Sequence, residues 1–374
     1  MTPKKRIIPK TNLLAPIIKW PGGKERELVH IFKNAPKDFN NFYDPFVGGG
    51  SVFMGIHANH YYINDLSSEL ISFYKCISTK DKLFFNKVNS ISNEWKYVGD
   101  LNSKIGCELK KIYTQFKNRV ILDIEQAVAQ VIKSQTNLIK KLDKGWNNFL
   151  FDCVNSLSEK MRRMNLLEQK KGDLSEVDLE KNINTALHNA FYIHLRRQYN
   201  KPVSDNHSAL FFFIRNLAYS GMFRYNSKGE FNVPYGGMGY NSKNFDKKIQ
   251  YYQSENLVKH FSKTIICNDD FEKFLIENSP STNDFVFLDP PYDSEFSTYA
   301  KNSFGQAEQI RLSNFLIKKC KAKWMLVIKY TDFIYNLYAN KKGINIQSFD
   351  KRYAVSFMNR NNQNVTHLIV RNYV

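Results

Sequence analysis

Asp289, Pro290, Pro291 and Tyr292 directly follow the apolar run of residues 285–288. A carboxylate at the carboxyl end of a buried strand lies where open α/β sheets bind their ligands. Pro290 removes one backbone donor and stiffens the loop, which leaves its carbonyl oxygen as an acceptor. Together with the flat face of Tyr292, these groups can hold an exocyclic amino group by its two hydrogens while the attached ring stacks. The alternative is a strand-to-loop turn that Asp289 caps.

A second segment, residues 44–51, carries three consecutive glycines after another strand-like run. Glycines there let the backbone approach a ligand closely, and the turn leads into the start of a helix. The third glycine of the dinucleotide fingerprint is missing, because Phe53 stands in its place. Asp65 comes 17 residues after Gly48 and ends the next strand-like run, where an acidic side chain typically binds ribose hydroxyls. This pattern favours an adenosine cofactor without a pyrophosphate, and a plain tight turn is the alternative.

Residues 19–24, Lys-Trp-Pro-Gly-Gly-Lys, have only a superficial likeness to the phosphate-binding loop of NTPases. That loop needs a glycine where Ile18 stands and a serine or threonine where Glu25 stands. We therefore reject an NTPase. In isolation, Trp20 would be a core aromatic residue and Lys24 a surface charge.

The elements that must position these residues lie near the two ends of the chain. Seven short runs bounded by turn residues have the composition of strands: residues 40–46, 60–65, 263–269, 283–291, 323–330, 343–349 and 366–373. Helical patterns separate several of them, which predicts a doubly wound α/β sheet. Between about Ser72 and Lys201 the pattern is helical, and in residues 123–142 apolar side chains recur mostly three or four apart. Residues 211–237 place the turn cluster 226–229 between two aromatic runs, which predicts a β-hairpin.

The charge of the chain favours nucleic acid as a partner. Lys and Arg number 54 against 35 Asp and Glu, a formal net charge of +19. Such a balance points to a polyanion, either nucleic acid or an anionic membrane surface. No apolar run approaches the ~18–20 residues of a membrane span, and residues 1–12 contain no apolar signal-peptide segment. The five cysteines are scattered and odd in number, so we expect neither a disulfide framework nor a metal site.

Taken together, these segments resemble the Dam-type, D12-class DNA N6-adenine methyltransferases of the α group. The likeness is carried by residues 17–24, 42–54, 61–71, 211–237 and 284–292. The resemblance implies a Rossmann-like, S-adenosylmethionine-dependent methyltransferase core of α/β class with a seven-stranded mixed sheet. We expect this core in residues 11–74 and 258–374. An inserted, mainly helical target-recognition domain, residues 75–257, would end in the β-hairpin, and residues 1–10 would form a basic tail.

The resemblance also implies roles for individual residues. Contact with S-adenosylmethionine is expected from Trp20, Lys24, Asp65 and Asp289, in a pocket that Asp44, Phe46 and Gly48 help to shape. Catalysis is expected from Asp289, Pro290 and Tyr292. DNA contacts are expected from Tyr219, Met222, Arg224, Asn232 and Pro234. Ser220 stands where the family usually has Asn, and the helical insert is longer than in compact members, so a GATC target is not assumed.

We expect direct methyl transfer from S-adenosylmethionine to N6 of an adenine flipped out of duplex DNA. Asp289 and Pro290 would accept the two amino hydrogens, and Tyr292 would stack on the base. The nearest alternative is cytosine-N4 methylation, which uses the same amino-group geometry. A non-catalytic DNA-binding protein on a methyltransferase fold is the alternative from a different class. We also expect a bacterial or phage-encoded protein in the cytoplasm, double-stranded DNA as partner, a cognate restriction endonuclease as a candidate partner, and no membrane.

Overall fold

The computed structural model describes residues 14–134, 147–202, 207–292, 304–352 and 364–374, and these fall into two compact units. The α/β unit comprises Met1–Thr79 and Tyr252–Val374, and the helical unit comprises Lys80–Tyr251. The first boundary comes five residues later than predicted, because α3 (Ser68–Ser78) continues to its end within the α/β unit. The second comes six residues earlier, since α11 (Glu255–Phe261) also belongs to that unit. The predicted tail, residues 1–10, lies outside the described residues.

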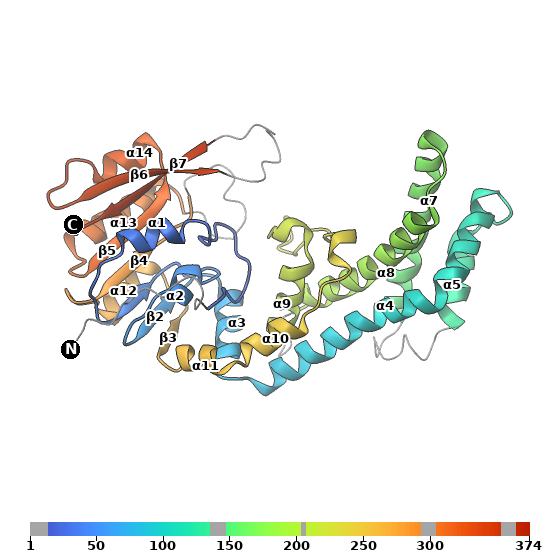
Figure 1. The fold of residues 1–374 in the computed structure, drawn as a ribbon, viewed down its shortest axis with the longest axis horizontal. Helices are drawn as coiled ribbons and strands as arrows, with labels where there is room; N and C mark the ends of the chain where they lie inside the picture. Colours follow the sequence, from blue (N-terminus) through green and yellow to red (C-terminus); the bar gives the residue numbers. More distant parts are fainter. Residues whose placement is uncertain (1–13, 135–146, 203–206, 293–303, 353–363) are drawn as a thin grey trace. The chain divides into compact units, whose positions relative to one another are not determined.

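A seven-stranded mixed sheet forms the centre of the α/β unit, in the order β3-β2-β1-β4-β5-β7-β6 (Figure 1). The strands are β1 (Phe42–Asp44), β2 (Tyr61–Asn64), β3 (Thr264–Cys267), β4 (Phe285–Leu288), β5 (Lys323–Lys329), β6 (Asn345–Arg352) and β7 (Asn364–Arg371). Neighbours from β3 to β5 pair in parallel, and β7 pairs antiparallel with both β5 and β6. All seven strands overlap the predicted runs, although β6 ends three residues later and β7 begins two residues earlier than predicted. The α/β class and the mixed sheet are therefore confirmed.

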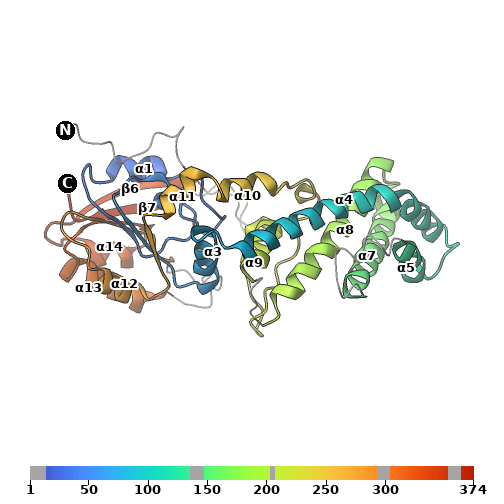
Figure 2. The same cartoon turned by 90° about the horizontal axis from the view of Figure 1, so that it is seen from below.

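Helices cover both faces of the sheet, as Figure 2 shows for α1 on one side of β6 and β7 and α12–α14 on the other. The bounds are α1 (Leu28–Asn34), α2 (Ser51–Gly55), α12 (Phe271–Asn278), α13 (Gln306–Lys318) and α14 (Asp332–Tyr338). Apolar residues of α12, α13 and α14 form one core with alternate residues of β4, β5 and β7, such as Leu288, Leu326 and Leu368. Because side chains alternate along a strand, the intervening residues of β4, β5 and β7 point toward the other face of the sheet, which α1 covers. Phe287 and His367 are two of these residues.

The helical unit is built around the long helix α4 (Lys82–Lys117). The Asp81 side chain caps its N-terminus by accepting a hydrogen bond from the Phe84 amide at 2.7 Å. Its further helices are α5 (Ile124–Ser134), α7 (Asn147–Lys171), α8 (Glu176–Tyr199), α9 (His207–Leu217) and α10 (Asp246–Tyr252). The predicted helix over 123–142 is described as far as Ser134 only.

The two ends of the helical unit are joined by side-chain contacts between α4 and the segment around α10. The Ser92 hydroxyl donates to Asp246 at 3.0 Å, and Lys96 pairs with the same carboxylate at 2.6 Å. The Trp95 indole donates to the Lys243 carbonyl at 3.1 Å. The chain therefore enters and leaves this unit at neighbouring places.

The predicted β-hairpin over residues 211–237 is wrong in its first arm. Residues 211–217 belong to α9, and isolated bridges pair only Ala218 with Tyr235 and Tyr225 with Phe231. The aromatic run of α9 is buried on all sides, and periodicity cannot separate such a helix from a buried strand. The predicted turn is present, since the Gly229 amide donates to the Asn226 carbonyl at 2.9 Å.

Candidate active site

Lys24 joins the two ends of the chain through the predicted catalytic residues. Its ammonium lies 2.6 Å from Oδ1 of Asp289 and donates to the Tyr292 hydroxyl at 2.8 Å and to the Gly22 carbonyl at 3.1 Å. Lys24 is 2% exposed, so the prediction that the segment 19–24 taken alone would give, a surface charge at Lys24, is wrong. A buried ammonium needs anionic and hydrogen-bonding partners, and these contacts supply them.

The loop after β4 holds Asp289 at the edge of the sheet. Pro290 is buried, and the Pro291 carbonyl accepts a hydrogen bond at 3.0 Å from the side chain of Gln309, which is itself fully buried in α13. The Asp289 side chain stays 18% exposed. The carboxylate therefore stands on a fixed loop and remains accessible to a ligand.

The glycine loop after β1 is folded against Trp20. A Cβ on Gly48, whose φ is +49°, would lie 2.8 Å from Cδ1 of Trp20, and one on Gly49 would lie 2.6 Å from the Ile18 carbonyl. The Tyr74 hydroxyl donates to the Gly48 carbonyl at 3.0 Å. The glycines are thus required by close packing of the loop on the segment that carries Trp20.

Asp65, at the end of β2, is tied to the same loop. One carboxylate oxygen accepts from the Gly48 amide at 3.1 Å and the other from the Ser67 amide at 2.9 Å. Burial raises the pKa of Asp65 to about 6, although both hydrogen bonds lower it. Around neutral pH the carboxylate is therefore mostly ionised, and it becomes neutral in mildly acidic solution.

Asp44, at the end of β1, is buried and accepts a hydrogen bond from the Phe46 amide at 3.2 Å. Burial raises its pKa well above the usual range, and the charges of Asp289 and Asp65 raise it further. The three carboxylates thus share one electrostatic environment, in which Lys24 is the buried cation. Such an acidic group of side chains suits a ligand with positive charge and hydroxyl donors.

Phe46 belongs to an aromatic cluster beside this loop. Its ring lies 5.7 Å from that of Phe271 and 5.5 Å, edge to face, from that of Phe304. The Arg311 guanidinium lies 4.2 Å from the centre of the Phe271 ring. This cluster offers a flat apolar surface next to the carboxylates.

The residues predicted to contact DNA all lie in the helical unit, on the connection after α9. Tyr219 is 42% exposed, its amide donates to the Pro234 carbonyl at 2.8 Å, and Met222 lies half-buried close by. The exposed Arg224 donates through Nε to Oδ1 of Asn232 at 2.9 Å. The structure therefore collects all five in one surface segment.

Three residues near the site were not predicted from the sequence: Glu27, Gln309 and His367. Glu27 lies three residues after Lys24, and its Oε2 is 3.8 Å from both Nζ of Lys24 and Nδ1 of His367. The i,i+3 spacing of Lys24 and Glu27 could have drawn attention to Glu27. No spacing in the sequence connects His367 or Gln309 with Asp289.

The described residues contain neither a cluster of metal ligands nor a membrane-spanning helix. No group of three or more His, Cys, Asp and Glu side chains there could hold a metal ion. No described helix is long and apolar enough to cross a membrane.

The chain is similar to known DNA methyltransferases over nearly its full length. A family model described as D12 class N6 adenine-specific DNA methyltransferase matches residues 20–104 and 105–355. The Type II methyltransferase M.CviBI of Paramecium bursaria Chlorella virus NC1A is 27% identical over 368 residues, 96% of this chain and 100% of the relative. The Type II methyltransferase M.MjaIII of Methanocaldococcus jannaschii is 28% identical over 96% of this chain and 99% of the relative. The DNA adenine methylase of Haemophilus influenzae is 23% identical over 90% of this chain and 88% of the relative.

Proposed function

Because the chain belongs to the D12 class of N6 adenine-specific DNA methyltransferases, we propose that S-adenosylmethionine is its methyl donor and that Asp289 receives the target adenine. The enzyme is a site-specific DNA adenine methyltransferase. The observation that supports the proposed site best is the Asp289 carboxylate, accessible at the end of β4 and joined to Tyr292 through the buried Lys24.

In the proposed reaction, Asp289 and the Pro290 carbonyl accept the two hydrogens of the adenine amino group. A carboxylate has two oxygens and about four lone-pair sites, so the pairing with Lys24 leaves it capacity to accept from an amino group. Two such bonds favour a pyramidal nitrogen, whose lone pair is then localised on the nitrogen instead of delocalised into the ring. The methylated nitrogen must lose one proton, and the Asp289 carboxylate that accepts its hydrogen bond would take it. The protein then contributes mainly by orienting the nucleophile, and it needs no covalent intermediate.

The residues around the glycine loop fit S-adenosylmethionine. Asp65 would accept hydrogen bonds from the ribose hydroxyls, and the Phe46 ring would lie against the adenine of the cofactor. The cationic part of the cofactor would lie among Asp44, Asp289 and Lys24, where carboxylates predominate, with Trp20 and Gly48 forming the wall. When bound, the cofactor supplies an electrophilic methyl group on a positively charged sulfur.

The helical unit would bind duplex DNA and select the target. It carries 28 Lys and Arg residues against 17 Asp and Glu residues, so phosphate contacts and a steep salt dependence are expected. Flipping the adenine costs a few kcal/mol, and stacking on Tyr292 returns roughly 1–3 kcal/mol. Tyr219, Met222, Pro234 and the Arg224–Asn232 pair, which form one surface segment, are proposed to enter the DNA.

The names of several relatives as Type II methyltransferases support a role in modification, with a cognate restriction endonuclease as a candidate partner. Since cellular or phage DNA is the substrate, we place the enzyme with that DNA in the cytoplasm of its host.

The test is base-resolved modification sequencing of unmethylated plasmid DNA after incubation with the enzyme and S-adenosylmethionine. We expect N6-methyladenine in one short sequence context, and no modification with the Asp289→Ala variant. N4-methylcytosine would refute the proposed target base. Full activity with a different methyl donor in place of S-adenosylmethionine would refute the proposed cofactor.

A further inference from the structure

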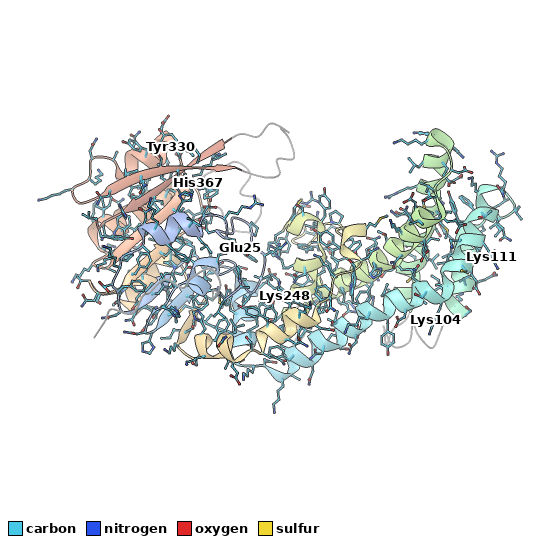
Figure 3. The ribbon with its side chains drawn as sticks, in the orientation of Figure 1. Glu25, Lys104, Lys111, Lys248, Tyr330 and His367 are labelled. Atoms are coloured by element: carbon cyan, nitrogen blue, oxygen red, sulfur yellow. The ribbon has the colours of Figure 1, made fainter. Side chains whose placement is uncertain are left out.

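Glu27 and His367 lie next to the residues proposed to receive the adenine, and the methyl transfer described above gives neither of them a role. Glu27 directly precedes α1 and is 2% exposed, whereas His367 lies in β7 and is fully buried. His367 pairs with Lys329 at the carboxyl end of β5, and β5 is the neighbour of β4, which Asp289 follows. Figure 3 labels His367 within the α/β unit. A chain segment from the end of the sequence therefore reaches the site from its buried side.

Glu27 acts on Lys24 through its charge. An ammonium has three donors, and the structure directs those of Lys24 to the Gly22 carbonyl, the Tyr292 hydroxyl and Asp289. At 3.8 Å the Glu27 carboxylate lies beyond hydrogen-bond distance but close enough for a strong Coulombic attraction in a buried place. Lys24 is thus held between two carboxylates, one on the buried side and one at the surface of the site.

His367 supports the Tyr292 ring directly. The two ring centres are 5.6 Å apart and the planes are nearly perpendicular, at 83°. Nδ1 of the same imidazole lies 3.8 Å from Oε2 of Glu27. The Tyr292 ring is therefore held by Lys24 at its hydroxyl and by the nearly perpendicular ring of His367.

We propose that Glu27 and His367 are positioning residues that hold Lys24 and Tyr292 from the buried side, so that the surface on which the adenine stacks is in place before the base arrives. The inference rests on the proposed function, because it assumes that the target base stacks on Tyr292. Stability alone is a poor explanation for this arrangement, since apolar residues of similar volume usually stabilise a core at least as well as buried ions do.

The variant Glu27→Gln removes the charge and keeps the volume. Its matched control is Glu25→Gln, because Glu25 is an exposed carboxylate two residues earlier in the same segment (Figure 3). Three quantities are measured for each full-length protein: the single-turnover rate of methylation, the dissociation constant of S-adenosylhomocysteine, and the fluorescence of 2-aminopurine placed at the target adenine. The last two need no methyl transfer.

We expect Glu27→Gln to lower the single-turnover rate about 10- to 100-fold, since displacement of a positioning group by about 1 Å has effects of this size. Binding of S-adenosylhomocysteine should change less than about threefold, and the 2-aminopurine signal of the flipped base should change because the base stacks differently. His367→Phe keeps a ring against Tyr292 but loses the contact with Glu27, and it should lower the rate in the same direction. The variant that carries both Glu27→Gln and His367→Phe should have a single-turnover rate within about threefold of that of Glu27→Gln alone, because both changes act through one carboxylate.

Wild-type rates for both Glu27→Gln and His367→Phe would overturn the inference. A loss of rate that is matched by an equal loss of S-adenosylhomocysteine affinity, with unchanged 2-aminopurine fluorescence, would make Glu27 a cofactor-binding residue instead. If Glu27→Gln does not fold, His367→Phe decides the matter alone. Failure of the wild-type protein to methylate any DNA would instead refute the proposed function, and that result is distinct from all of these.

Discussion

The raised pKa of Asp65 predicts how cofactor affinity depends on pH. Burial raises this pKa to about 6, from an ordinary value near 3.8, against the effect of hydrogen bonds from the Gly48 and Ser67 amides. Ribose hydroxyls donate hydrogen bonds, so they need the ionised carboxylate. At pH 5 about a tenth of Asp65 is ionised, and the association constant should be about tenfold lower than at pH 8, a loss of ~1.4 kcal/mol.

The stability of the ligand-free enzyme should change in the opposite direction. Between about pH 4 and pH 6, Asp65 is protonated in the folded state and ionised in the unfolded state, so the folded state binds more protons. The contribution of Asp65 to the free energy of unfolding therefore rises as the pH falls through this window, by up to ~3 kcal/mol. Cofactor binding and thermal stability should thus respond to mild acid with opposite signs.

The assay is isothermal titration of S-adenosylmethionine between pH 5 and pH 8 with the wild type, Asp65→Asn and Asp332→Asn. Asp332 is the matched control, because it is an exposed carboxylate that closely follows the end of β5. Asp44 is present in all three proteins, so the difference between the wild type and Asp65→Asn isolates Asp65. Affinity that is flat with pH in the wild type, or an unchanged step near pH 6 in Asp65→Asn, would refute the reasoning.

Three further predictions concern the reaction, the target and the loop. Asp289→Ala should abolish turnover, a loss of at least ~10²-fold in single-turnover methylation, and retained wild-type rates would exclude Asp289 as the amino acceptor. Arg224→Ala removes the partner of Asn232 and should reduce discrimination at one base pair by ~1–3 kcal/mol, with cofactor affinity unchanged. The measurement is the methylation rate on cognate and near-cognate duplexes. Equal losses of rate on both duplexes would make Arg224 a phosphate contact. Gly48→Ala places a Cβ 2.8 Å from Trp20 on a residue with φ of +49°. It should lower the free energy of unfolding, measured by urea denaturation, by ~1–2 kcal/mol, and it should also weaken cofactor binding. Unchanged stability would show that the loop relaxes freely.

The sequence was sufficient to predict the sheet, because most of its strands are short apolar or aromatic runs bounded by turn residues. It was not sufficient for residues 211–217, because six of these seven residues are buried and only Asn216 is half-buried, which leaves no exposed polar face to reveal a helical period. Local pattern separates buried from exposed faces, and it fails where no face is exposed.

The candidate site could be predicted only in part, for a related reason. Asp289, Asp65 and the glycine loop follow strands, so the topology of a parallel sheet brings them to one edge. The pairing of Lys24 with Asp289 joins residues 265 positions apart, and it was not predicted, because the likeness to a family implied only that both residues contact S-adenosylmethionine. Glu27 and His367 escaped prediction because their contact depends on the antiparallel placement of β7, which no local spacing encodes.

The contacts between α4 and the α10 segment affect how the chain folds. β1 and β4 are neighbours in the sheet, yet the whole helical unit separates them in the sequence. Once Ser92 and Asp246 are joined, the chain that must close between β1 and β4 shortens about threefold, because only the stretches before Ser92 and after Asp246 still count. The entropic cost of this closure then falls by about 1 kcal/mol. An insertion whose ends are joined thus shortens the closure between two distant pieces of one sheet, and the chain between Ser92 and Asp246 can change in length without lengthening that closure.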